Sequence, residues 1–166
     1  LRSDLFSWVW KGVTFLGDAG WFWIVLTAFL LFQKKTRKAG FTAALALIIG
    51  SIVTNLILKN AVARIRPYDA VEGLIPLVAK LKDYSFPSGH TCASFACAVV
   101  YYRMYPDKPG KAALILAVLI AVSRLYVGVH YPTDVLAGGL IGWLSAVAAM
   151  EMVPYLERRK TVKDKN

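Results

Sequence analysis

Apolar residues gather in five blocks along the chain, and polar or charged residues occupy the stretches between them. The blocks cover residues 21–32, 39–58, 91–102, 112–127 and 132–153. A transmembrane helix needs about 20 predominantly apolar residues, so residues 39–58 are long enough to cross a bilayer unaided. The shorter block at 21–32 must extend over Ala19 and Gly20 and rely on lysine side chains that reach the headgroups. The pattern predicts an all-α integral membrane helical bundle with five transmembrane helices.

The first 18 residues precede these blocks and have a different character. Trp8 and Trp10 stand among charged residues such as Arg2 and Lys11, and the run is too polar to cross a membrane. Aromatic residues beside charges are typical of the membrane–water interface, so residues 1–18 are expected to form an interfacial helix. The length of 166 residues fits one membrane-embedded domain, residues 1–166.

The polar stretches also carry predictions about helix ends and packing. The helix that includes residues 39–58 is expected to continue to about Ile65, where Pro67 stops it. Residues 71–79 are expected to form a short interfacial helix. Three glycines in the last block are expected to allow close helix packing. These are Gly138, Gly139 and Gly142.

Composition supports the membrane class. The chain is 57% hydrophobic with a mean hydropathy of +0.52, above the roughly 45–50% apolar content of soluble domains. A net charge of +10 could indicate nucleic-acid binding, but no soluble basic face is visible, and we expect no nucleic-acid partner. Cys92 and Cys97 lie inside an apolar block without zinc-ligand spacing and are interpreted as small buried hydrophobic residues.

Most of the basic residues lie in three clusters that flank the apolar blocks. The clusters are Lys34, Lys35, Arg37 and Lys38; Arg103, Lys108 and Lys111; and Arg158, Arg159, Lys160, Lys163 and Lys165. The positive-inside rule makes these segments cytoplasmic, including a basic C-terminal tail at residues 157–166. The protein is thus expected in the cell membrane as a multi-pass protein with its C-terminus in the cytoplasm. The observed N-terminus would then lie outside, which predicts a further helix upstream of Leu1 and six in the full-length protein.

Three polar segments fall on the opposite, extracytoplasmic face: residues 59–67, 87–90 and 123–134. They contain Lys59, Arg66, Ser88, His90, Arg124, His130 and Asp134. A charged side chain near hydrocarbon costs about 2.5–3.5 kcal/mol at a helix centre and less at the interface. Several cations on one face therefore favour a compensating anion such as phosphate, which the two arginines can bind through planar forks.

Backbone and hydroxyl groups add donors to this phosphate site. The Ser88 hydroxyl and the N–H groups of Gly89 and His90 lie where a helix begins, which favours an anion. His130 and Asp134 are four residues apart, so the carboxylate can orient the imidazole for attack on phosphorus. His90 would protonate the leaving group. No acidic cluster suited to magnesium accompanies them, so we expect neither a metal nor a cofactor.

The same polar residues also have purely structural interpretations. Residues 123–134 could be a polar loop capped by Thr133 or Asp134, and Arg124 could form a structural salt bridge with Asp134. Arg64 has no partner in the pattern and is interpreted as a solvated or headgroup contact, with a substrate role as the alternative.

Taken in order, the three segments resemble the signature of the type 2 phosphatidic acid phosphatase family, whose site is shared with vanadium haloperoxidases. The pattern K-x(6)-R-P is met by Lys59, Arg66 and Pro67. The pattern P-S-G-H is met by residues 87–90, and S-R-x(5)-H-x(3)-D by Ser123, Arg124, His130 and Asp134. The resemblance implies a membrane phosphatase, typically with six helices.

In that family the motif residues have assigned roles. The resemblance implies that His130 forms a phosphohistidine, that Asp134 supports it and that His90 is the acid. The phosphate ligands would be Lys59, Arg66, Ser88, Gly89 and Arg124. The expected substrate is a lipid phosphate or pyrophosphate of the phosphatidylglycerol phosphate, phosphatidate, polyprenyl pyrophosphate or lipid A type. A lipid phosphotransferase and a catalytically silent anion-binding or transport bundle are the alternatives.

Overall fold

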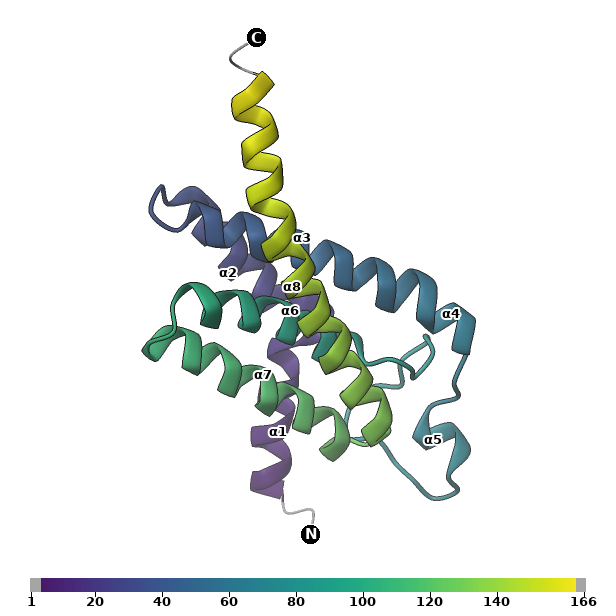
Figure 1. Ribbon diagram of the computed structural model, residues 1–166. Helices are drawn as coiled ribbons and strands as arrows, with labels where there is room; N and C mark the ends of the chain where they lie inside the picture. The colour runs from purple at the N-terminus through teal and green to yellow at the C-terminus, as the bar shows by residue number, and fades with distance from the viewer. Residues whose placement is uncertain (1–3, 164–166) are drawn as a thin grey trace.

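The protein is a bundle of helices joined by short turns and one long loop (Figure 1). The structure, a computed structural model, describes residues 4–163, with side chains described for residues 4–156. The helices are α1 (Asp4–Leu16), η1 (Asp18–Gly20), α2 (Trp21–Phe32), α3 (Arg37–Ser51), the π-helix η2 (Ile52–Leu58), α4 (Lys59–Val62), α5 (Pro67–Ala70), α6 (Gly89–Met104), α7 (Lys108–Tyr126) and α8 (Pro132–Lys163). No strand occurs among residues 4–163, which confirms the all-α prediction.

Helix α6 lies at the centre and packs against α3, α7 and α8. Small side chains such as Ala96 and Cys97 are fully buried and let the neighbouring helices approach closely. Added methyl groups on Gly138 and Gly142 would lie 2.5 and 2.4 Å from backbone oxygens of α6. The predicted close packing is therefore confirmed for these two glycines, whereas Gly139 has only ordinary contacts.

Three helical stretches are long and apolar enough to cross a membrane: Arg37–Ala70, Lys108–Tyr126 and Pro132–Leu156. Helices α1 and α2 meet at an angle of 42° and would together make a fourth, bent span. Helix α6 has 16 residues and is shorter than a typical span. Five crossings with an interfacial helix at residues 1–18 therefore stay a prediction.

The loop between the second and third blocks differs from the sequence-based prediction. The helix ends at Val62, because Ala63 adopts a left-handed conformation with φ of 47°. Pro67 does not stop a helix but begins one, the short α5, at the first-turn position where a missing N–H costs nothing. The predicted helix at residues 71–79 is wrong, since this stretch is non-helical and packs partly through apolar side chains such as Leu77.

Helix α8 runs past Pro154, beyond the predicted end of its block at residue 153. The predicted basic tail at residues 157–166 lies outside the residues whose side chains are described.

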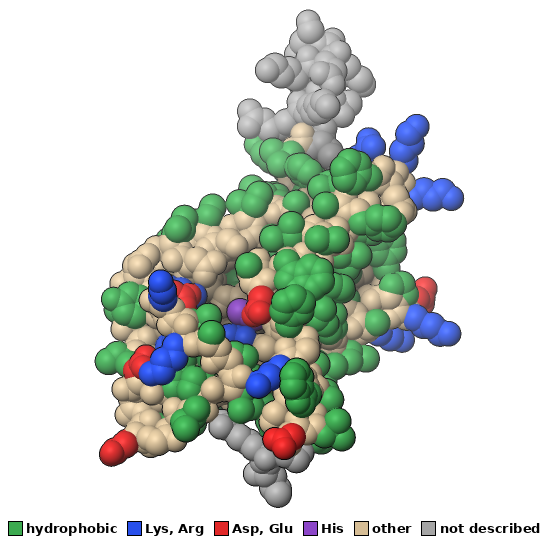
Figure 2. Space-filling model, turned by 180° about the vertical axis from the view of Figure 1, so that it is seen from behind, with side chains coloured by type: hydrophobic (Ala, Val, Ile, Leu, Met, Phe, Trp, Pro, Cys, Tyr) green, Lys and Arg blue, Asp and Glu red, His purple; other side chains and the backbone are tan. Residues whose placement is uncertain are grey.

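The two ends of the bundle differ in polarity. In Figure 1 the α2–α3 and α6–α7 turns lie at the left, and α4, α5 and the long loop lie at the right. Figure 2, seen from behind, shows mainly basic side chains along the edge formed by those two turns. Acidic and basic side chains mix in the left half of this view, and a histidine beside an acidic side chain lies near its middle, next to an apolar surface.

Candidate active site

Hydrogen bonds to backbone carbonyls tie the three polar segments together at this mixed end. The guanidinium of Arg66 donates to the Val129 carbonyl at 2.9 Å, next to His130. The Ser88 N–H donates to the Asp134 carbonyl, also at 2.9 Å. All seven polar residues singled out above, from Lys59 to Asp134, thus belong to segments that meet at one end of the bundle.

Lys59 and Arg66 share one carboxylate, that of Asp83 in the long loop. The Lys59 ammonium donates to one Asp83 oxygen, and Arg66 Nη2 donates to the other at 2.6 Å. Both cations are almost fully buried, whereas the Asp83 side chain is half exposed. Burial raises the pKa of Asp83, but the hydrogen bonds and charges of the two cations outweigh it, so the pKa lies below its usual range. Asp83 was not among the residues predicted from the sequence.

The P-S-G-H segment caps the start of α6. Ser88 is the fully buried N-cap residue, and its hydroxyl accepts a hydrogen bond from the Thr91 hydroxyl at 3.0 Å. A methyl group on Gly89 would lie 4.0 Å from the Lys59 ammonium and 3.2 Å from the Asn55 side-chain oxygen. The lysine therefore lies close to the first N–H groups of α6, an arrangement suited to an anion.

Arg124 is 1% exposed, although it carries a guanidinium group. Its Nη1 donates to the Thr14 hydroxyl of α1, and its Nε has no hydrogen-bond partner. A buried unpaired donor costs about 1–3 kcal/mol, so this atom needs an acceptor that the side chains around it do not supply. The predicted alternative of an Arg124–Asp134 salt bridge is wrong, because no such pair forms among the described residues.

His130 follows α7, in the turn that leads to α8. Its Nδ1 lies 3.4 Å from Asp134 Oδ2, without the geometry of a hydrogen bond. Burial lowers the pKa of His130 to about 4; the nearby Asp134 carboxylate opposes this shift, and the charges of Arg124 and Arg66 reinforce it. The imidazole is therefore neutral near pH 7, and Nε2 is the ring nitrogen directed away from the carboxylate.

Asp134 is fully buried and held by three donors outside the predicted set. Arg64 donates to Oδ1 at 2.8 Å, while the Ser85 hydroxyl and the Tyr131 N–H donate to Oδ2. Arg64 also donates to Thr133 at 2.6 Å and lies over the Tyr131 ring. The interpretation of Arg64 as a solvated or headgroup contact is therefore wrong, because its guanidinium pairs with a buried carboxylate that needs a counter-charge.

His90 sits in the first turn of α6 and is mostly buried. Its Nε2 lies 2.7 Å from Asp18 Oδ1, in the junction between α1 and α2. Asp18 was not singled out in the sequence, so the sequence-based prediction missed this contact. An acidic residue between two apolar segments was the available signal.

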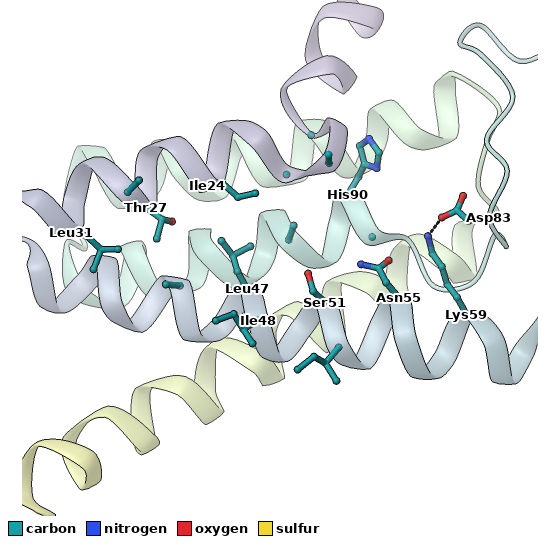
Figure 3. Close-up of a pocket in the computed structure, with 18 residues that line it drawn as sticks. Ile24, Thr27, Leu31, Leu47, Ile48, Ser51, Asn55, Lys59, Asp83 and His90 are labelled. Atoms are coloured by element: carbon teal, nitrogen blue, oxygen red, sulfur yellow. Dashed lines mark hydrogen bonds and ion pairs between the residues drawn. The ribbon is translucent and has the colours of Figure 1, made fainter.

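A cavity of about 660 Å³ opens beside His90 and runs between α2 and α3, and we call it the α2–α3 groove (Figure 3). Its polar end is formed by Lys59, Asp83, Gly89 and His90. The remainder is mainly apolar and includes Ile24, Leu31, Ala44, Leu47 and Ile48. The groove therefore joins a charged pocket to a long apolar surface, which fits a molecule that has a polar head and a hydrocarbon tail.

The fold and this site define a helical membrane protein in which buried cations and two histidines gather at one end of the bundle, where Lys59 and His90 line the end of an apolar groove. Residues 39–158 match the PAP2 superfamily, and the chain belongs to that family. The resemblance drawn from the three motifs is confirmed. The matched stretch contains every site residue that was predicted from the sequence. Asp18, which contacts His90 in the structure, lies outside this stretch.

Known proteins give the same classification. The chain is 42% identical over 124 residues to the undecaprenyl-diphosphatase of Sulfolobus acidocaldarius, covering 74% of this chain and 60% of that protein. The crystal structure of a PAP2-type phosphatidylglycerolphosphate phosphatase from Bacillus subtilis superposes with a TM-score of 0.73 at 30% identity, covering 92% of this chain and 78% of the other. The crystal structure of LpxE from Aquifex aeolicus superposes with a TM-score of 0.77 at 27% identity, covering 90% of this chain and 88% of LpxE.

Proposed function

We propose that this protein is a metal-independent membrane lipid phosphatase that hydrolyses a lipid phosphate monoester or pyrophosphate through a phosphohistidine. The observation that carries the proposal is the α2–α3 groove, whose apolar length ends at Lys59, Gly89 and His90. Family membership and the names of the relatives support it. Among the residues described, no three His, Cys, Asp or Glu side chains form a group that could hold a metal.

The phosphate would be bound by buried donors from all three motifs. Lys59, Arg66 and Arg124 supply positive charge, and the unpartnered Nε of Arg124 is one donor awaiting an acceptor. Ser88 and the Gly89 N–H would add donors at the start of α6. Phosphoryl transfer depends mainly on such positioning and charge stabilisation.

The reaction would proceed in two steps. Nε2 of His130 attacks phosphorus, and the leaving oxygen keeps the bonding electrons and takes a proton from His90. Water then attacks the phosphohistidine, gives its proton to His90 and releases inorganic phosphate. Asp134 would stabilise the positive charge that the His130 ring carries while it is phosphorylated. The low pKa of His130, about 4, keeps the attacking nitrogen unprotonated at neutral pH.

The lipid tail would lie in the α2–α3 groove. Polyprenyl pyrophosphate is the first substrate to test, because the Sulfolobus acidocaldarius relative is named an undecaprenyl-diphosphatase. Phosphatidylglycerol phosphate, phosphatidate and lipid A phosphates follow, since two structural relatives are a phosphatidylglycerolphosphate phosphatase and LpxE.

The site would face the extracytoplasmic side of the cell membrane. The α2–α3 and α6–α7 turns lie at the opposite end of the bundle (Figure 1) and carry basic clusters that the positive-inside rule places in the cytoplasm. Helix α8 would then end in the cytoplasm.

The proposal is tested by phosphate release from this lipid panel, using detergent-purified protein with EDTA present. The native protein should turn over at least one lipid, and His130→Ala should abolish turnover and any acid-labile phosphoprotein trapped by rapid quenching. Ordinary turnover by His130→Ala would refute the nucleophile, and loss of activity in EDTA would refute metal independence.

The same assay separates the alternatives. A phosphotransferase would release little inorganic phosphate until an acceptor alcohol is added, and the label would then appear in the acceptor. A silent anion-binding or transport bundle would bind the lipids without forming any product.

A further inference from the structure

The junction between α1 and α2 is shaped to hold a carboxylate against His90. Ala19 and Gly20 both adopt positive φ angles, of 50° and 69°, which turn the chain sharply after Asp18. The Trp21 indole N–H donates to the Phe15 carbonyl at 2.8 Å and ties the two helices across the turn. A left-handed alanine is uncommon, so this conformation has a cost that the surrounding contacts must offset.

The junction also lies directly against the imidazole. A methyl group on Gly17 would come within 2.8 Å of both His90 Cδ2 and the Ile120 side chain. Only glycine therefore allows the chain to approach His90 this closely. Asp18 Oδ1 then reaches His90 Nε2 at 2.7 Å, while the other end of the carboxylate remains open to water, since the side chain is 53% exposed.

We propose that Asp18 is a positioning residue for His90, so that the site contains two histidine–carboxylate pairs, one for each histidine. This inference rests on the proposed function, in which His90 is the acid. Because a carboxylate accepts hydrogen bonds, Asp18 fixes the Nε2–H form of the ring and leaves Nδ1 to exchange the reacting proton.

The proton balance follows from this assignment. As the bond between phosphorus and the leaving oxygen breaks, that oxygen takes the proton from Nδ1, and the ring becomes neutral with Nε2–H still donated to Asp18. In the second step the attacking water returns a proton to Nδ1. Asp18 keeps its negative charge throughout and balances the charge of the protonated ring.

Three charged groups face His90 from the elements packed around it: Asp18 from the junction, Lys59 from α4 and Arg124 from α7. Burial has the largest effect on the pKa of His90 and lowers it below its ordinary value, and the two cations lower it further. The Asp18 carboxylate opposes this shift, because it stabilises the protonated imidazole. Removing the carboxylate charge should therefore shorten the pH range over which His90 can donate a proton.

The test compares Asp18→Asn with the native protein on an alkyl phosphate, whose leaving group needs protonation, and an aryl phosphate, whose leaving group does not. General acid catalysis contributes about 10²–10⁴-fold, so Asp18→Asn should lower kcat for the alkyl ester by at least about tenfold and spare the aryl ester. The alkaline limb of the alkyl kcat profile should move to lower pH. Asp18→Glu should recover part of the loss.

A double-mutant cycle shows whether Asp18 acts through His90. Asp18→Asn should have little further effect in a His90→Gln background. Additive losses, a rise in KM alone, or equal losses on both esters would overturn the proposal and point to Arg124 or to general damage. Asp107→Asn, which changes an exposed carboxylate at the far end of α6, is the matched control and should behave as the native protein.

The two proposals fail in different ways. If the native protein releases phosphate and depends on His130, but Asp18→Asn keeps full alkyl activity, only the role of Asp18 is refuted. If no substrate is turned over, or if His130→Ala is active, the proposed function itself is refuted. Detergent gel filtration and thermal unfolding of each variant establish that it is folded.

Discussion

The predicted phosphate ligands Lys59 and Arg66 hold the Asp83 carboxylate between them, a counter-charge that lies outside the motifs. Asp134 pairs in the same way with Arg64, whereas the buried Arg124 donates to the neutral Thr14 hydroxyl. Removing one partner of a buried ion pair leaves an uncompensated charge, which costs about 3–5 kcal/mol. A phosphate bound by both cations would compete with Asp83 for their donors. Phosphate binding at these cations would therefore exchange one anion for another, and it would couple the loop that carries Asp83 to occupancy of the pocket.

The ionisation of His130 can be measured directly, because the chain has two histidines. In His90→Gln the remaining imidazole should titrate with a midpoint near pH 4, below the ordinary value of about 6.5, because burial and the arginines disfavour its charged form. The folded protein thus keeps the ring neutral as the pH falls from 7 to 5. Histidine-labelled NMR in micelles provides the measurement.

The same variant unfolded in denaturant is the control and should titrate near pH 6.5. A midpoint near that value in the folded protein would contradict the buried environment of His130.

Motif order could predict which segments meet at this end of the bundle, but only short spacings, such as the four residues between His130 and Asp134, encode a contact directly. The pairing of His130 with Asp134 follows from such spacing, although 3.4 Å separates their nearest atoms. The counter-charges could not be predicted in this way. Asp83, Arg64 and Asp18 reach their partners across the tertiary structure, at sequence separations that no local pattern encodes.

At the scale of the helices, the contact between α6 and α8 sets the register of two motifs. Gly138 lies against the Ser88 carbonyl, where an added methyl group would come within 2.5 Å of backbone. Gly138→Ala should therefore push α8 from the start of α6, at a typical overpacking cost of about 1–3 kcal/mol. The thermal unfolding midpoint, followed by circular dichroism in detergent, should fall, and phosphate release should fall with it.

Gly139→Ala is the matched control, because its methyl group would meet nothing closer than 3.8 Å. It should unfold at the native temperature or slightly above, since alanine favours helix over glycine by about 0.5–1 kcal/mol. Equal destabilisation by both substitutions would mean that helix propensity, and not the contact with Ser88, controls this interface.

Helices with long apolar runs could be located from the sequence, and α2 has the bounds of its apolar block. The predicted extension of this helix over Ala19 and Gly20 is wrong, because both residues adopt positive φ angles. The conformation of the segment between α4 and α6 could not be predicted from the sequence, because its apolar residues suit either a helix or a packed irregular segment. Leu77, for example, donates its N–H to the Val127 carbonyl at 3.0 Å and packs beside Tyr68 instead of continuing a helix. Pro67 likewise serves a helix start as well as a helix end, and local sequence does not distinguish the two.

At the scale of the whole molecule, the polarity of the two bundle ends and the course of the α2–α3 groove both favour one orientation of a bound substrate. The α2–α3 and α6–α7 turns lie at one end of the bundle (Figure 1) and carry mainly basic side chains (Figure 2). The segments that carry the site residues meet at the other end. The α2–α3 groove extends from the second end along the bundle (Figure 3). On the proposed function, a lipid headgroup would enter the charged pocket while its tail lies in the groove among the helices.

This arrangement predicts that a bulky side chain in the groove blocks long tails and spares the chemistry. Ala44 lines the apolar part of the groove, away from the charged end, so Ala44→Phe should raise KM for a long-chain lipid phosphate at least about tenfold, the equivalent of about 1.4 kcal/mol. Turnover of a short water-soluble phosphate ester should stay native, because His90 and His130 are untouched. Ala112→Phe, on the exposed surface of α7, is the matched control and should change neither value. Equal loss on both substrates would show that the groove supports the fold of the site, and unchanged kinetics on the lipid would place the tail elsewhere.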